Sequence, residues 1–126
     1  IGNPRAYEPE AFHIPMIFAG GVLNVQDSIV RTIGSQTDMV ATLFSQLNLD
    51  HSAYKFSKNL LAEDIVPFAY YAYSGAGGFI SREGVSVYNL QNNHFIQGDS
   101  LRWNDEHLKA YLQVVDEDIN RNRSGY

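Results

Sequence analysis

The chain of 126 residues contains no cysteine, which excludes a disulfide framework and a zinc site built from thiolates. Positive charge is also scarce, because nine Lys and Arg, scattered singly, stand against fourteen Asp and Glu. A protein that binds a nucleic-acid backbone gathers positive charge on one face, so we expect no nucleic-acid partner. No apolar run approaches the roughly 20 residues that a membrane helix requires, and no signal segment opens the sequence. We therefore expect the piece itself to be soluble.

What the sequence does contain is typical of a folded domain. Apolar residues make up 44% of the chain and charged residues 18%, a balance that favours a globular protein over a disordered one. The length suffices for one core, since chains near this size bury about two-thirds of the surface that they expose when unfolded. The sequence begins with Ile1 and continues "GNPRAYEPE", a loop-like segment without periodicity. We interpret the chain as an excised fragment of a longer protein.

The first half of the chain predicts two short strands and a helix. Ile14–Phe18 is a continuous apolar run stopped by two glycines, which is typical of a strand covered on both faces in a parallel sheet. A second short strand is predicted at Ile29–Ile33. The segment that follows carries an apolar stripe at helical spacing, with Ser35 or Thr37 as its cap and Asn48 as its end.

The second half changes pattern. Four short runs, "FAYYAYSG", "GFISREG", "VSVYNLQ" and "NHFIQGD", are rich in aromatic and β-branched residues and are separated by Gly and Asn turns. They predict a four-stranded antiparallel sheet. The last segment predicts a helix that begins at Asn104 as cap and ends near Arg123, and we expect it to cover one face of the sheet. The fold class is thus α+β for the fragment.

Four stretches carry a resemblance to a known family: "HIPMIFAGGVL", "IVRTIGSQTDMVATLFSQLNLD", "SKNLL" and "VPFAYYAYSGAGGFI". Their order resembles the C-terminal end of the sulfatase-like enzymes grouped with lipoteichoic acid synthases and phosphoglycerol transferases, in the alkaline phosphatase superfamily. The resemblance rests on the order of all four stretches, since no single one is decisive. It implies that residues 1–62 form one edge of an alkaline-phosphatase-like α/β core, and that residues 63–126 form a small antiparallel sheet with a closing helix.

The resemblance also implies where the chemistry is located. Members of this family use a Thr or Ser nucleophile on a divalent metal (Mn, Zn, Ca or Mg) that is held by acidic residues and an Asp-His-Gly tripeptide. All of these lie upstream of the matching stretch, so we assign no catalytic and no metal-ligating residue to this chain. The implied protein is a metal-dependent sulfatase-like phosphotransferase or hydrolase acting on phospho- or sulfo-esters at the cell envelope. It is anchored on the outer face of the membrane, and the fragment alone is expected to be inactive.

One departure from the family concerns the substrate. Some lipoteichoic acid synthases carry a substrate-touching histidine shortly before the "VPF" strand, where this chain has Glu63 and Asp64. The difference argues against glycerol-phosphate polymerisation. It leaves phosphoglycerol transfer to another acceptor, phosphoethanolamine-type transfer and sulfate ester hydrolysis open.

A few residues are candidates for a site within the fragment. Arg5 stands in the loop that, in the resembling enzymes, leads away from the metal site, and its guanidinium is shaped to bind phosphate or sulfate oxygens. The alternative is a solvated loop arginine. His13 precedes the first predicted strand. It either donates a hydrogen bond to a bound phosphate or is a structural residue. Asp50 and His51 imitate the family's Asp-His pair but are followed by Ser52 instead of glycine, which predicts a surface turn.

Other motifs predict structure and no site. His94 and His107 lack the paired spacing of metal ligands. The "GAGG" sequence at Gly75–Gly78 lies between two predicted strands and opens no helix, so it predicts a hairpin turn and not a phosphate loop.

The expected partner is the upstream part of the same catalytic domain. Without that part, the fragment is expected to form a homodimer or a strand-exchanged pair through residues 12–47, because an open sheet edge with apolar faces favours self-association. An alternative function is an independent extracytoplasmic module that binds carbohydrate or peptide. In that case Tyr70, Tyr71, Tyr73 and Tyr88 of the predicted sheet would present the binding surface.

Overall fold

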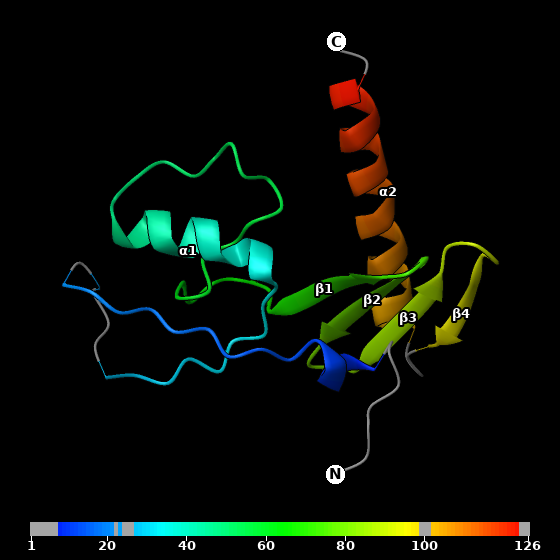
Figure 1. The fold of residues 1–126 in the computed structure, drawn as a ribbon, viewed down its shortest axis with the longest axis horizontal. Helices are drawn as coiled ribbons and strands as arrows, with labels where there is room; N and C mark the ends of the chain where they lie inside the picture. The colour runs from blue at the N-terminus through cyan, green and yellow to red at the C-terminus, as the bar shows by residue number, and fades with distance from the viewer. Residues whose placement is uncertain (1–7, 22, 24–26, 99–101, 124–126) are drawn as a thin grey trace. The chain divides into compact units, whose positions relative to one another are not determined.

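The computed structural model describes residues 8–21, 23, 27–98 and 102–123 (Figure 1). The chain divides into two compact units: one consists of residues 1–12 together with 70–126, and the other of residues 13–69. We call them the sheet unit and the inserted unit, because the second interrupts the first in the sequence. From the sequence we divide the chain into two parts between residues 62 and 63. In the structure the chain passes from one unit to the other between residues 12 and 13 and between residues 69 and 70.

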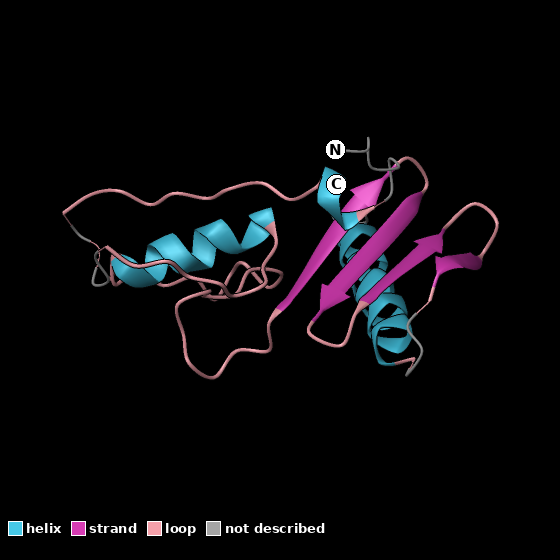
Figure 2. Ribbon diagram, turned by 90° about the horizontal axis from the view of Figure 1, so that it is seen from below, coloured by secondary structure: helices cyan, strands magenta, loops and turns pink. Residues whose placement is uncertain are grey.

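A four-stranded antiparallel sheet with a C-terminal helix forms the centre of the sheet unit, as the sequence predicts (Figure 2). The strands follow one another in space in chain order, and a register shift interrupts the third pairing at Val87/Tyr88. Their bounds are β1 Phe68–Tyr73, β2 Ala76–Ser81, β3 Val85–Asn89 and β4 His94–Gln97. Gly75 and Asn93 have positive φ in the turns before β2 and β4, a conformation that favours glycine and asparagine.

The glycines of "GAGG" only partly form the predicted turn. Gly75 lies in it, but Gly77 and Gly78 belong to β2. A Cβ on Gly77 would stand 3.1 Å from a ring carbon of Tyr70, and a Cβ on Gly78 would overlap the ring of Tyr71. The two tyrosines of β1 therefore lie over the neighbouring strand on opposite faces, and glycine is needed where their rings approach its backbone.

Helix α2, Trp103–Arg123, covers one face of the sheet, as predicted (Figure 2). Its Leu108 is completely buried, and its Trp103 ring lies 6.2 Å from that of Phe79 on β2. The prediction that Asn104 caps this helix is wrong. The helix already includes Asn104, whose buried side chain faces β2, with its Oδ1 2.7 Å from the Ser81 hydroxyl oxygen.

The opposite face of the sheet is covered by the N-terminal segment. A short 3-10 turn, η1 (Pro9–Ala11), leads into Phe12, whose ring stacks on Tyr71 at 4.3 Å between centroids. Phe12 packs on the cluster formed by Tyr71, Ala76 and Val87. Phe12 and α2 therefore pack on opposite faces of the sheet.

The burial of Tyr71 predicts a loss of stability at alkaline pH. Burial, with a smaller effect from Glu10, raises the pKa of Tyr71 to about 12, whereas the pKa of a tyrosine in the unfolded chain is about 10. Between these two values the unfolded state releases its proton first, so the free energy of unfolding falls as the pH rises. Urea unfolding at stepwise pH should show this fall, and Tyr71→Phe should reduce it. Part of it will remain, because burial also raises the pKa of Tyr70. If the free energy of unfolding of Tyr71→Phe fell just as much with rising pH, the loss of stability would not come from Tyr71.

The inserted unit contains the predicted helix. A 3-10 turn, η2 (Gln36–Asp38), continues into α1 (Met39–Gln46), and Ser35 precedes them in a capping box with Asp38. Asn48 follows the helix with φ of 53°, the left-handed conformation that often ends helices. Of the two predicted caps, Ser35 and Thr37, the structure shows Ser35, and the predicted end at Asn48 is confirmed.

The two predicted strands of the inserted unit are wrong for the described residues. The segments 14–18 and 29–33 belong to no strand and no sheet in this part of the chain. Ile17 is 86% exposed and Ile29 is 81% exposed. The apolar pattern was identified correctly, but a strand requires a neighbour to bond with, and the described elements provide none here.

Candidate functional site

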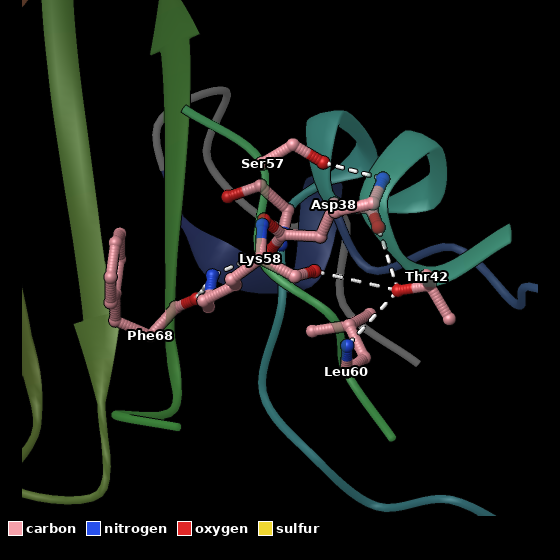
Figure 3. Close-up of polar contacts among 8 residues, drawn as sticks. Asp38, Thr42, Ser57, Lys58, Leu60 and Phe68 are labelled. Carbon is pink, nitrogen blue, oxygen red and sulfur yellow. Dashed lines mark hydrogen bonds and ion pairs between the residues drawn. The ribbon is translucent and has the colours of Figure 1, made fainter. Parts of the chain in front are cut away.

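The inserted unit holds the one buried carboxylate among the residues that the structure describes. Asp38 is 1% exposed and lies where η2 passes into α1. One oxygen accepts the backbone N–H of Ser35 at 2.7 Å and the ammonium of Lys58 at 2.6 Å, and the other accepts the backbone N–H of Lys58 at 3.0 Å (Figure 3). Both oxygens are therefore engaged, and the negative charge is balanced by an adjacent positive one.

Lys58 connects this carboxylate to the start of β1. Its Nζ also donates to the carbonyl oxygen of Phe68 at 2.9 Å and lies 3.9 Å from the centre of the Phe68 ring (Figure 3). The lysine side chain is 18% exposed, so the ammonium is largely removed from water. Its contacts with a carboxylate, a carbonyl and an aromatic face replace the lost hydration.

Two hydroxyl groups tie α1 to the segment around Lys58. The Thr42 hydroxyl donates to the carbonyl of Asp38 at 2.7 Å and accepts the N–H of Leu60 at 3.0 Å. The Ser57 hydroxyl accepts the N–H of Ala41 at 2.9 Å. We call Asp38, Thr42, Ser57, Lys58 and Phe68 the Asp38 cluster.

The Asp38 cluster joins three of the stretches that carry the family resemblance. Asp38 belongs to "SQTD", Lys58 to "SKNLL" and Phe68 to "VPF". Because the carboxylate and the ammonium occupy each other, the cluster has the chemistry of a structural joint and not of a general acid or base. Sequence analysis did not find it, since the two charges are twenty residues apart.

A second group of polar side chains lies where α2 begins on the sheet. The Ser81 hydroxyl oxygen is 2.7 Å from both Glu83 Oε2 and Asn104 Oδ1, and the Ser86 hydroxyl donates to Asp105 at 2.5 Å. A hydroxyl has one proton, so Ser81 donates to one of its two neighbours at a time. These contacts fix the first turn of α2 to β2 and β3.

Two of the residues singled out from the sequence, Asp50 and His51, lie in one surface turn. Arg5 lies outside the described residues, and His13 is exposed. Asp50 accepts both the N–H and the hydroxyl of Ser52, each at 2.9 Å, which confirms the predicted surface turn. These two hydrogen bonds, the backbone one foremost, lower the pKa of the exposed Asp50 below its ordinary value. His51 follows it in this turn.

The remaining two histidines lie on different elements, His94 on β4 and His107 on α2. His94 is exposed at the start of β4, and the ring of His107 stacks on Trp103 at 3.7 Å within α2. In the part of the chain that the structure describes, no three His, Asp or Glu residues are placed to hold a metal ion. The described helices also include none that is long and apolar enough to span a membrane.

The four tyrosines of the alternative binding surface are divided between the two faces of the sheet. The ring of Tyr70 lies 4.7 Å from that of Tyr111 on α2, and Tyr88 shares this face, with Lys109 of the helix near its ring. Tyr71 and Tyr73 contact Phe12 on the opposite face. The four side chains therefore do not form a single aromatic platform.

Comparison of the chain with protein-family models, with curated proteins and with solved structures gives no match.

Proposed function

We propose that the chain is the C-terminal part of a metal-dependent sulfatase-like phosphotransferase or hydrolase. The parent enzyme acts on phospho- or sulfo-esters at the outer face of the cell membrane. The observation that supports the proposal is the order of the four motif stretches. Three of them fold together at the Asp38 cluster. In this role the chain forms the last part of the catalytic domain. The nucleophile and the ligands of the divalent metal belong to the upstream part, where the reaction takes place.

The apolar run 14–18 is where we place the contact with that upstream part. Among the described residues of the inserted unit, the buried apolar ones are Ala41 and Leu60, whereas Ile14, Met16 and Ile17 are exposed. Burial contributes about 25 cal/mol per Å² of apolar surface, so an uncovered run of this kind favours a partner.

The complete product of the gene tests this function. We expect the codons before Ile1 to encode an Asp-His-Gly tripeptide and, farther upstream, a Thr or Ser nucleophile. With Mn²⁺, the complete product should hydrolyse a phosphodiester or sulfate ester reporter, and alanine at the nucleophile should abolish turnover. A secretion signal directly before Ile1 would instead favour the independent binding module.

The 126-residue chain alone should show no phosphodiesterase or sulfatase turnover. It should also bind Mn²⁺, Zn²⁺ and Ca²⁺ only weakly, because a tight site requires several converging donors. Calorimetric titration with each ion measures this. A stoichiometric site of micromolar affinity that disappears in His13→Ala or His51→Ala would contradict the proposal, since the chain would then carry a metal site of its own.

A further inference from the structure

Helix α1 buries a polar side and exposes an apolar one. The buried polar side chains at this helix are spaced four residues apart: Asp38, Thr42 and Gln46. The apolar side chains one position later have the same spacing, and each is between 38% and 41% exposed: Met39, Leu43 and Leu47. We call these last three residues the α1 stripe. The usual arrangement in a globular protein is the reverse, so an exposed apolar stripe of this kind indicates a surface that contacts a partner.

The charges around the α1 stripe indicate which partner fits it. Between residues 32 and 49 the sequence has one charged residue, Asp38, which is buried in its pair with Lys58. The chain as a whole has a net charge of −5, so two copies repel each other over most of their surfaces, but not at this neutral helix. The partner surface that fits is apolar and uncharged, and a second α1 stripe meets both conditions.

We propose that the α1 stripes of two copies of this chain pack against each other, with the helices antiparallel about a two-fold axis at Leu43. The stripe is symmetric about Leu43, so this register places Leu43 opposite Leu43 and Met39 of each copy opposite Leu47 of the other. The antiparallel order also places the positive end of each helix dipole beside the negative end of the other. Three side chains are few against the roughly 20 residues per side of a standard interface, so we expect a weak dimer. The inference concerns the 126-residue chain and does not depend on the proposed function.

Light scattering behind a sizing column, over a series of concentrations, measures the dimer. We expect a dimer at high micromolar concentration, and at least a tenfold weaker one for Leu43→Asp, which places two carboxylates at the axis. Leu90→Asp makes the same change at another exposed leucine, in the sheet unit, and should leave the dimer unchanged. Circular dichroism verifies that each variant is folded. A monomer at all concentrations would overturn the proposal, and if that monomer bound phosphatidylcholine vesicles through Leu43, the stripe would be a lipid contact instead.

Because the chain has no cysteine, disulfide crosslinking tests the register without interference. Leu43→Cys should form a covalent dimer under mild oxidation. Met39→Cys and Leu47→Cys should each form little alone, since their equivalent positions lie about 12 Å apart along the paired helices, beyond the reach of a disulfide. An equal mixture of these two variants should crosslink. A Leu43→Cys variant that stays monomeric, or a mixture that crosslinks no better than its components, would overturn the proposed pairing. None of these readouts involves turnover, so they are distinguishable from a failure of the proposed enzyme function.

Discussion

Asp38→Ala should lower the free energy of unfolding of the inserted unit by about 3–5 kcal/mol, the cost typical of removing one partner of a buried ion pair. The variant leaves the Lys58 ammonium without its carboxylate and takes the acceptor from the backbone N–H groups of Ser35 and Lys58. Since a domain is stable by only about 5–15 kcal/mol, α1 should exchange its amide protons much faster. Hydrogen exchange of peptides covering α1 measures this within one unit, even if the two units unfold separately.

Two further variants separate the buried pair from a general effect of lost charge. Asp50→Ala removes an exposed carboxylate that bonds to Ser52, and it should change stability by no more than about 0.5 kcal/mol. Lys58→Met added to Asp38→Ala should recover part of the loss, because it removes the uncompensated charge and retains an apolar stem. If Asp38→Ala costs no more than Asp50→Ala, the pair does not hold the inserted unit together.

The elements that sequence analysis predicted correctly are those specified by local pattern. The four strands follow from alternating aromatic and β-branched residues between turn residues, and α2 follows from its helical spacing with acidic residues at its start. The "SQTD" helix likewise carries its own start signal in the capping box at Ser35. Each of these signals lies within about 20 residues of sequence, so no tertiary information was needed.

The errors arose where distant parts of the chain decide the outcome. The run 14–18 has the composition of a strand, but composition does not show whether a neighbouring strand is present. Asn104 is a residue type that often caps helices, yet its side chain is buried against the hydroxyl of Ser81, which lies more than twenty residues away in the sequence. Phe12 lies in a segment without periodicity, so its stacking on Tyr71 could not be predicted from local pattern.

The candidate site shows the same division. The local interpretation of Asp50 as a surface turn was sufficient, because its partner is two residues away. The Asp38 cluster depends on a contact across twenty residues, and a lysine or an aspartate in a polar stretch gives no sign of burial by itself. Thr42 gives no such sign either, because it lies outside the apolar stripe of its helix: Thr42 is 1% exposed, whereas Met39 and Leu43 of the stripe are 41% and 40% exposed.

Leu108→Ala should lower the free energy of unfolding of the sheet unit by about 2–5 kcal/mol, because it opens a cavity where α2 meets the sheet. Leu108 is completely buried, whereas Val114, farther along the same helix, is 53% exposed. Val114→Ala is therefore the matched control, and its effect should stay within about 0.5 kcal/mol. Trp103, near Phe79 on β2, provides a fluorescence signal for urea unfolding of this unit. Equal losses in the two variants would mean that α2 does not derive its stability from packing on the sheet.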